Sequence, residues 1–155
     1  MMKFVRIFSF LFVCIFCVEN FLFAGDKEKK DNAASVAGIY EGTAFVEIMQ
    51  QEMKLKLELI RIHKDSVIVK VTDFVLPNGQ KFNYRSQGVS VKSEVKQGKK
   101  IYNLYISFSY DYNGMPMEVK ASGKVIDGQL DSEVKATIMQ SMETKVTYKA
   151  KKQEK

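Results

Sequence analysis

The sequence predicts an all-β fold, an eight-stranded antiparallel up-and-down barrel, and two observations support this prediction. From Lys100 to Ile138, apolar and polar residues alternate with the period of two that is typical of a half-buried strand. The alternation is interrupted at Asn113-Gly114 and at Asp127-Gly128. Such dipeptides accept the positive φ angles that two-residue hairpin turns require, so three strands should form a meander.

Each of these turns sets a register, and the two registers agree. Across the first turn the facing pairs are Tyr110 with Met117, Phe108 with Val119, Ile106 with Ala121 and Leu104 with Gly123. Across the second they are Val125 with Leu130, Ala121 with Val134, Val119 with Ala136 and Met117 with Ile138. All these residues fall on one face, which indicates a sheet with one apolar and one polar side.

Five further strands are expected, at residues 36–49, 53–62, 66–75, 80–96 and 142–150. The inner face of the first is expected to hold Tyr40, Gly42, Ala44, Val46 and Ile48. A turn at Gln50-Gln51 would place Ala44 opposite Leu57. Because glutamine suits a two-residue turn poorly, we expect a looser loop of four residues there.

Two irregularities are expected within these strands. Between Leu59 and Ile60 the inner phase slips by one residue, which a β-bulge would explain. Gly88 either kinks one long strand or separates two short strands. In the second case the barrel would have nine strands, and every turn before Gly88 would lie at the opposite end of the barrel. Antiparallel strands in this number favour closure into a barrel, which removes exposed edges, over a two-sheet sandwich.

The N-terminus is typical of a secretory signal peptide over residues 1–24. Lys3 and Arg6 precede an apolar run that is too short for a membrane span, and the small residue Ala24 suits cleavage. We expect a flexible charged leader over 25–35, a barrel domain over 36–150 and a disordered tail over 151–155. The mature chain of 131 residues is the size of one domain.

This organisation predicts an exported protein, periplasmic or extracellular, with no transmembrane span in its mature chain. Cys14 and Cys17 lie inside the apolar run, so the mature chain has no thiol chemistry. Val13 and Phe16 precede these cysteines, whereas a lipid anchor requires a small residue at that place.

The scattered charges and the lack of known motifs argue against nucleic-acid binding, metal binding, phosphate binding and catalysis. Lys3, Arg6 and Glu19 fall in the signal peptide, which leaves 22 Lys and Arg against 17 Asp and Glu, scattered over solvent faces. Nucleic-acid binding is therefore not expected. His63 lacks neighbouring metal ligands, and no phosphate-binding glycine loop is present. We expect no enzyme activity, no metal and no cofactor.

The first predicted strand opens with the sequence VAGIYEGT from Val36, which resembles the start of the bacterial calycin-like domain family. Gly38-Ile39-Tyr40 stands where lipocalins have G-x-W at the closed end of the barrel. The resemblance covers Val36–Ala150 and implies a lipocalin-like barrel with a small apolar ligand and no catalytic residues. The sequence departs from the family in one respect. In lipocalins a basic residue late in the chain often packs on the Trp, whereas here the expected register places Arg61 opposite Tyr40.

Every methionine of the mature chain is expected at one end of the barrel. This end has the turns at 50–51, 77–79, 113–114 and 139–141, and its methionines are Met49, Met53, Met115, Met117, Met139 and Met142. The other end has polar turns and Tyr40. Because methionine adapts to irregular apolar shapes, the methionine end is either a ligand mouth or a plug.

A ligand in the barrel would contact the inner wall and the methionine mouth. The residues expected to line this site are Met53, Leu55, Leu57, Phe82, Tyr84, Ile106, Phe108, Tyr110, Met115, Met117, Met142 and Tyr148. Small neighbours should leave volume between them: Gly42, Ala44, Ala121, Gly123, Ser132 and Ala136. The hydroxyl groups of Tyr84, Tyr110 and Tyr148 are candidate polar contacts.

The sequence therefore favours a binding protein that carries or sequesters a small apolar ligand or a lipid. The alternative is a structural or interaction module with a filled barrel, which docks on another protein of the cell envelope. Cavity volume distinguishes the two, because a drug-sized ligand needs roughly 300 Å³ or more of space.

Overall fold

The computed structural model describes residues 30–75, 79, 81–112, 114–138 and 140–154, and the barrel forms one unit from Asp31 onward. The predicted signal peptide, residues 1–24, and the first part of the leader, 25–29, lie outside the described residues.

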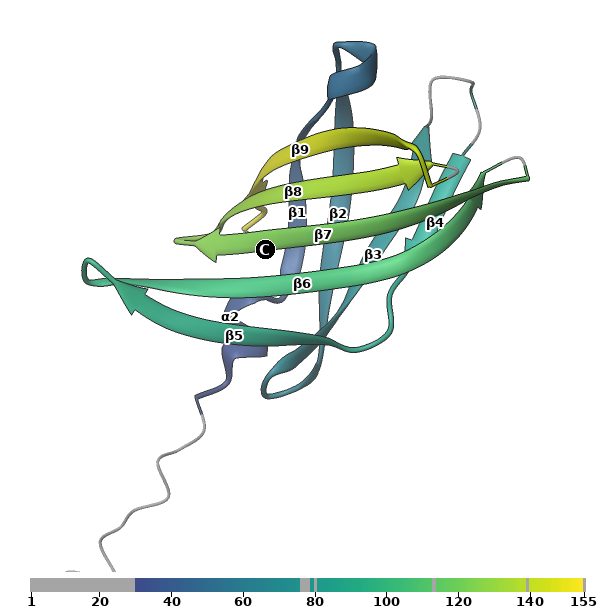
Figure 1. Ribbon diagram of the computed structural model, residues 1–155. Helices are drawn as coiled ribbons and strands as arrows, with labels where there is room; N and C mark the ends of the chain where they lie inside the picture. The colour runs from purple at the N-terminus through teal and green to yellow at the C-terminus, as the bar shows by residue number, and fades with distance from the viewer. Residues whose placement is uncertain (1–29, 76–78, 80, 113, 139, 155) are drawn as a thin grey trace, which may run out of the picture. The chain divides into compact units, whose positions relative to one another are not determined.

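The barrel has a short helix, a 3-10 turn and nine strands (Figure 1). They are α2 (Asn32–Val36), β1 (Gly38–Val46), η1 (Glu47–Met49), β2 (Gln51–His63), β3 (Ser66–Val75), β4 (Lys81–Arg85), β5 (Val89–Lys96), β6 (Lys99–Tyr112), β7 (Met115–Ile126), β8 (Gln129–Ile138) and β9 (Met142–Lys152). All paired strands are antiparallel.

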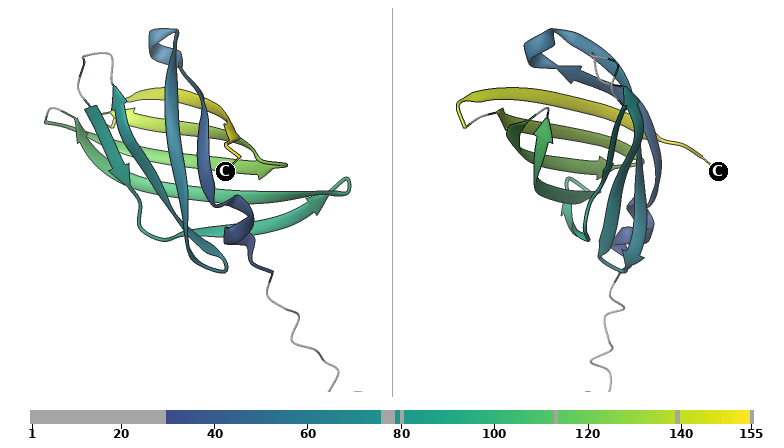
Figure 2. Two further views of the ribbon diagram at one scale, coloured as in Figure 1. Left: turned by 180° about the vertical axis from the view of Figure 1, so that it is seen from behind. Right: turned by 90° about the vertical axis from the view of Figure 1, so that its right-hand side faces the viewer.

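The sheet closes on itself because β9 pairs with β1 and β2 pairs with β3. β4 and β5 both pair with β3 and together occupy one position, so the ring is an eight-stranded up-and-down barrel. Figure 2 shows that β1–β4 and β6–β9 diverge toward the end that holds η1. The predicted fold class is confirmed.

The predicted meander is confirmed residue by residue. Tyr110 lies opposite Met117 across the first turn, and Val125 lies opposite Leu130 across the second. Asp127 and Gly128 have φ angles of 49° and 75°, the signs that the two-residue turn requires. The alternation of apolar and polar residues and the turn sequences were sufficient to predict this register, because both depend on residues that are close in the chain.

The β1–β2 register differs from the predicted one. Ala44 lies opposite Met53 rather than Leu57, and Val46 pairs with Gln51. The connection is the expected four-residue loop, made of η1 and Gln50, which has a φ of 50°. Ile48 belongs to η1 and is 57% exposed, so its predicted place on the inner face is wrong. The shift is by an even number of residues, so the inner face is otherwise preserved.

A β-bulge does interrupt β2, but it lies later than predicted. Arg61 pairs with Val67 and His63 pairs with Ser66, so the extra residue is Ile62. Leu59 consequently faces Val69 inside the barrel. Tyr40 lies opposite Leu57, so the expected juxtaposition of Arg61 and Tyr40 is wrong.

Gly88 lies in a break that separates β4 from β5, the second of the two alternatives. Both strands remain antiparallel to β3, so the two ends of the barrel do not exchange. Ser86 connects the two ladders at the break. The Val69 amide donates to Ser86 Oγ at 2.8 Å, and the Ser86 amide donates to the Val69 carbonyl at 2.9 Å.

Helix α2 closes the end opposite the methionines, so the fold begins before the predicted boundary at residue 36. Ala33 and Val36 are fully buried, and the Tyr40 hydroxyl donates to the Val36 carbonyl at 2.7 Å. Asp31 accepts from the Ala34 amide and forms an ion pair with Arg61 at 2.7 Å. The leader was expected to be flexible because its charged and small residues offered nothing to bury, whereas Ala33 is in fact buried.

The chain also remains in the sheet beyond residue 150. β9 extends to Lys152, whose amide donates to the Gly128 carbonyl at 2.8 Å. The Gln153 amide donates to the Ile39 carbonyl at the same distance. The predicted disordered tail thus begins too early, because β1 and β8 supply ladder partners that the tail composition does not reveal.

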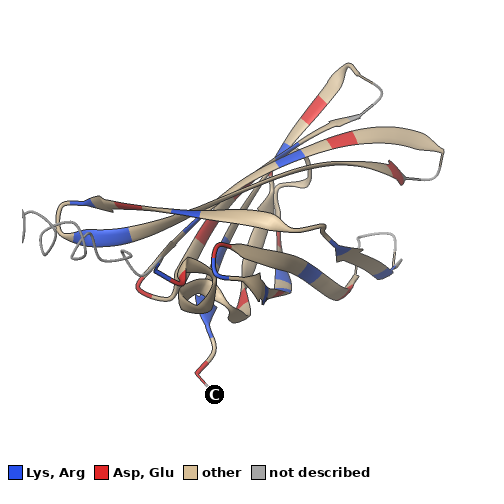
Figure 3. Ribbon diagram, turned by 90° about the horizontal axis from the view of Figure 1, so that it is seen from below, with Lys and Arg blue, Asp and Glu red and all other residues tan. Residues whose placement is uncertain are grey.

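Charged residues lie mostly on the outer face of the barrel. Basic and acidic positions are interspersed along the strands in the view of Figure 3. Several form exposed pairs, such as Lys145 with Glu133 at 2.7 Å and Lys56 with Glu41 at 3.4 Å. Exposed pairs of this kind contribute little to stability, on the order of 0–1 kcal/mol.

Candidate functional site

The packed half of the barrel, near α2, leaves little internal space. Its cavity measures about 40 Å³. The lining residues are Leu57, Leu59, Val69, Leu104, Ile106, Ala121, Gly123, Leu130 and Ser132. One water needs roughly 10–15 Å³ by this measure, so the cavity holds a few waters at most. The small residues expected to leave volume leave much less than a drug-sized ligand needs, because neighbouring side chains occupy it.

Tyr148, one of the predicted site residues, belongs to the buried core of the barrel. Its hydroxyl lies 3.1 Å from the carbonyl oxygens of both Tyr40 and Leu55, and its side chain is 2% exposed. Burial, and secondarily Glu41, raises the pKa of Tyr148. The hydroxyl predicted as a polar contact for a ligand thus lies within hydrogen-bond distance of two backbone carbonyls inside the barrel.

The opposite half of the barrel, which we call the open half, carries apolar side chains that are only partly buried. Met53 and Leu55 on β2 and Met115 and Met117 on β7 are all partly buried. Met142, at the start of β9, is 52% exposed. These side chains are therefore neither fully buried in the barrel nor fully exposed to solvent. Met139 lies outside the described residues.

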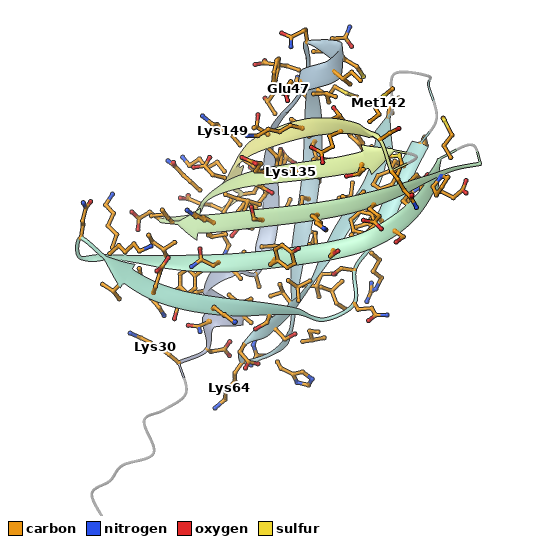
Figure 4. All side chains as sticks on the ribbon, viewed as in Figure 1. Lys30, Glu47, Lys64, Lys135, Met142 and Lys149 are labelled. Atoms are coloured by element: carbon orange, nitrogen blue, oxygen red, sulfur yellow. The ribbon has the colours of Figure 1, made fainter. Side chains whose placement is uncertain are left out.

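The loops around this mouth also expose apolar side chains. Ile48 in η1 and Val75 at the end of β3 are 57% and 52% exposed. Figure 4 places Glu47 and Met142 at this end of the barrel and Lys64 at the other end. Exposed apolar groups from several loops at one end are typical of a binding surface.

One side of this open half has a gap in the backbone ladder. β6 pairs with β5 from Lys99 to Leu104, whereas its residues from Tyr105 to Tyr112 pair only with β7. β4, which lies on the far side of the gap, pairs only with β3. We call the contact between β4 and this part of β6 the aromatic seam.

Aromatic rings rather than backbone hydrogen bonds join the two strands at the seam. Tyr84 stacks on Phe108 with ring centroids 4.2 Å apart, and Phe82 meets Tyr110 edge-on at 5.2 Å. Burial raises the pKa of Tyr84. Each such aromatic pair contributes roughly 0.5–1.5 kcal/mol beyond the area it buries. Four residues predicted to contact ligand thus meet at one place.

A second space, which we call the lateral pocket, lies beside the seam. It is open to solvent and measures about 460 Å³. Its lining residues are Tyr84, Arg85, Ser86, Gln87, Gly88, Val89, Ser90, Tyr105, Ile106, Ser107 and Phe108. Sequence reasoning missed most of them, because they line a pocket only where the break at 86–88, between β4 and β5, lies beside β6 in the closed barrel. The phase change at Gly88 was the available signal.

No group of His, Cys, Asp and Glu suited to hold a metal ion occurs in the described part of the chain. His63, at the end of β2, is exposed. Within the same residues, no helix has the length and apolar character needed to cross a membrane.

The fold and this site define a small closed β-barrel with one packed and one open half. No family model and no curated protein matches the chain. Solved structures do resemble it, among them two of low sequence identity. A "putative outer membrane protein" of Bacteroides fragilis aligns with a TM-score of 0.50 and 18% identity, over 79% of this chain and 53% of its own.

The second similar structure is a redesigned β-barrel, with a TM-score of 0.53 and 17% identity over 81% of this chain and 97% of its own. The chain spans about half the length of the Bacteroides protein. At these identities both structures show the fold alone, so function rests on the site.

Proposed function

We propose that this chain is an exported, lipocalin-like binding protein of the bacterial cell envelope, which holds a small apolar or amphipathic ligand in the open half of its barrel. The observation that supports this function is the division of the barrel. Side chains fill the half near α2, whereas Met53, Phe82, Tyr110 and Met117 remain partly exposed around the other half.

The proposed site differs from the one expected from the sequence in its depth. A ligand would contact the methionine mouth and the aromatic seam, and would not enter the packed half. Leu57 and Tyr148 then serve stability, while the mouth residues provide apolar contact. Met and aromatic side chains suit this task because they offer large apolar areas that adapt to ligand shape.

Membership of the calycin-like family and the absence of catalysis are parts of the same proposal. The opening Val36–Thr43 motif leads into β1, and Tyr40 lies at the closed end, where the resemblance requires it. A binding protein needs no catalytic constellation, and the mouth side chains are apolar and aromatic.

The alternative function, an interaction module that docks on another envelope protein, is favoured by the small internal cavity of about 40 Å³. In that case the exposed Ile48, Val75 and Met142 would contact a protein partner. Native mass spectrometry of protein purified from its own cells distinguishes the two, because a copurified small molecule or lipid supports the carrier and a bound protein supports the module.

The paired change Met53→Lys and Met117→Lys tests the binding site. Both side chains are partly buried at the mouth, so two charges there should weaken binding of a fluorescent apolar probe by at least several-fold. The expected size follows from about 1.5–3 kcal/mol for each fully buried methionine. Fluorescence titration measures the loss, and circular dichroism checks that the fold survives.

A matched control adds two lysines to the outer wall, Ser122→Lys and Thr137→Lys. These positions lie opposite Glu133 and Glu118, so the added charges are compensated. Equal probe binding by both double variants would contradict a site at the mouth. Unfolding of the Met53 and Met117 variant alone would show instead that the methionines are structural, and the binding proposal would lose its support.

Export is tested by cell fractionation followed by N-terminal sequencing of the mature protein. The expected first residue is Gly25, released by cleavage after Ala24, in the periplasmic or extracellular fraction. A mature chain that starts at Cys14 or Cys17, or retention in the inner membrane, would contradict the signal-peptide interpretation.

A further inference from the structure

We propose that the lateral pocket binds the carboxylate head of an anionic amphipath, whose apolar chain contacts the aromatic seam. This inference rests on the proposed function, because it specifies the ligand class of the same open half. Its basis is the chemistry of the pocket wall, which combines unpaired strand backbone, one guanidinium, several hydroxyl groups and an apolar floor.

The backbone of β6 makes the pocket polar. In an antiparallel sheet, alternate residues direct their N–H and C=O groups toward opposite neighbours. From Tyr105 to Tyr112, β6 has a partner strand on the β7 side alone among the described residues. The groups that point toward β4 therefore need water or another polar partner. A ligand head that replaces this water keeps those hydrogen bonds, which a purely apolar ligand cannot do.

The positive charge in the pocket wall favours a ligand whose head group is negatively charged. Among the described residues, Arg85 is the one charged residue that lines the pocket, and no carboxylate lines it. Its guanidinium forms no ion pair or hydrogen bond with the side chain of any described residue. Arginine presents a planar set of donors that matches a carboxylate in two places at once.

Neutral donors and neighbouring cations strengthen this preference. The side chains of Ser90, Tyr105 and Ser107 add hydroxyl groups to the same wall. Lys120 lies directly opposite Ser107 on the adjoining strand β7. Lys70, which lies opposite Arg85, is already paired with Glu58 at 3.6 Å and is thus partly neutralised. The local excess of positive charge comes from Arg85 and Lys120.

The floor of the pocket accounts for the apolar chain. Tyr84 and Phe108 line the pocket and also form the stacked pair of the seam. Ile106 lines both the lateral pocket and the small internal cavity, so it adds an apolar side chain to the pocket. The volume of about 460 Å³ falls within the roughly 300–1,000 Å³ typical of small-molecule sites.

The test compares three single-chain probes with equal chain length and different heads: dodecanoate, dodecanol and dodecyltrimethylammonium. Each is titrated into the purified protein by calorimetry, below its critical micelle concentration. Dodecanoate should bind at least ten-fold more tightly than the cationic probe, and its affinity should fall as salt is added. Equal affinities for the three probes would overturn the anionic head site.

Arg85→Gln should weaken dodecanoate binding about 10- to 100-fold and leave dodecanol binding unchanged, because a charged hydrogen bond is lost and the apolar contacts remain. Arg85→Lys should retain part of the affinity. Lys54→Gln on the outer face of β2 removes an equal charge elsewhere and should have no effect. Arg85 is exposed, so none of these changes should unfold the barrel.

The outcomes separate this inference from the proposed function. If dodecanol and dodecanoate bind and Arg85→Gln weakens neither, the carboxylate site is wrong and an apolar site at the mouth stands. If no probe binds the native protein, both proposals fail together, and the interaction module becomes the better account.

Discussion

Gly42 lies where β1 and β9 approach each other too closely for a side chain. A Cβ atom at this position would lie 2.0 Å from the Lys149 carbonyl oxygen and 2.5 Å from the Cα of Ala150. Both are backbone atoms of β9, which cannot move without breaking the ladder that closes the barrel. The glycine is therefore required by the close approach of two strands.

We predict that Gly42→Ala destabilises the protein by about 1–3 kcal/mol, or more if the β1–β9 ladder separates. Gly123→Ala is the matched control, because its new methyl group would meet the flexible Leu130 side chain at 3.3 Å beside the internal cavity. Urea denaturation measures both. A similar loss for the two variants would contradict the special role of Gly42.

Tyr40 predicts how stability depends on pH. Burial raises its pKa from 10.0 to about 12, so the folded protein favours the neutral phenol. This contribution to the free energy of unfolding is complete below pH 10 and is lost as the pH rises toward 12, with a slope of up to about 1.4 kcal/mol per pH unit for each proton.

Tyr40→Phe should lower stability below pH 10, because the hydrogen bond to Val36 is lost, and should flatten the decline above pH 10. Tyr105→Phe, at a position that is 62% exposed, should leave that decline unchanged. Denaturation curves between pH 8 and pH 12 measure the slopes. An unchanged slope in the Tyr40 variant would show that other groups govern the alkaline transition.

At the scale of elements, α2 closes one end of the barrel through contacts with several strands. The Ala33 amide donates to the Lys64 carbonyl at 3.0 Å, between β2 and β3. Lys100 of β6 and Lys152 of β9 donate to Asn32 and to the Ser35 carbonyl. A helix of five residues is not stable by itself, so these contacts and its buried face maintain it.

Val36→Ala should therefore destabilise the barrel by roughly 1–3 kcal/mol, because it removes two methyl groups from a fully buried site. Ala34→Ser, on the exposed side of the same helix, should change stability by much less. Thermal unfolding compares the two. If both variants match the native protein, α2 is not an integral part of the fold.

The break between β4 and β5 depends on Ser86, a buried polar residue whose amide and hydroxyl both bond with Val69 of β3. Ser86→Ala removes the acceptor for the Val69 amide, and an unsatisfied buried donor costs roughly 1–3 kcal/mol. We expect lower stability and faster amide hydrogen exchange at Val69. Ser90→Ala, at an exposed position nearby, is the control. Unchanged exchange at Val69 would contradict this role.

At the scale of the whole barrel, closure depends on the last residues of β9. Ala150 and Lys151 pair with β1 on one side and with β8 on the other, and Lys152 pairs with Tyr40 of β1. Removal of residues 150–155 should destabilise the barrel by several kcal/mol, because it opens the ring beside Tyr40, whereas removal of 154–155 should have little effect. Urea denaturation of the two truncated chains measures the difference, and equal stability would contradict closure by β9.

The sequence by itself determined the strands, the meander register and the two chemically different ends. Asp127-Gly128 and the alternation around it act between residues close in the chain, so they can be recognised without a structure. The same reasoning expected the four-residue loop at Gln50 but assigned the wrong β1–β2 register, because polar residues alone do not show where the paired strands end. It also placed the bulge between Leu59 and Ile60 instead of at Ile62, since either position restores the alternation of inner and outer residues.

Only the tertiary structure decided how α2, the break at Gly88 and the lateral pocket are arranged. Asp31 meets Arg61 across 30 residues of chain, and Ser86 meets Val69 across 17. Tyr84 and Phe108 are likewise brought together by closure of the ring. Such contacts depend on which strands become neighbours, and no local pattern of hydrophobicity or turn chemistry encodes that choice.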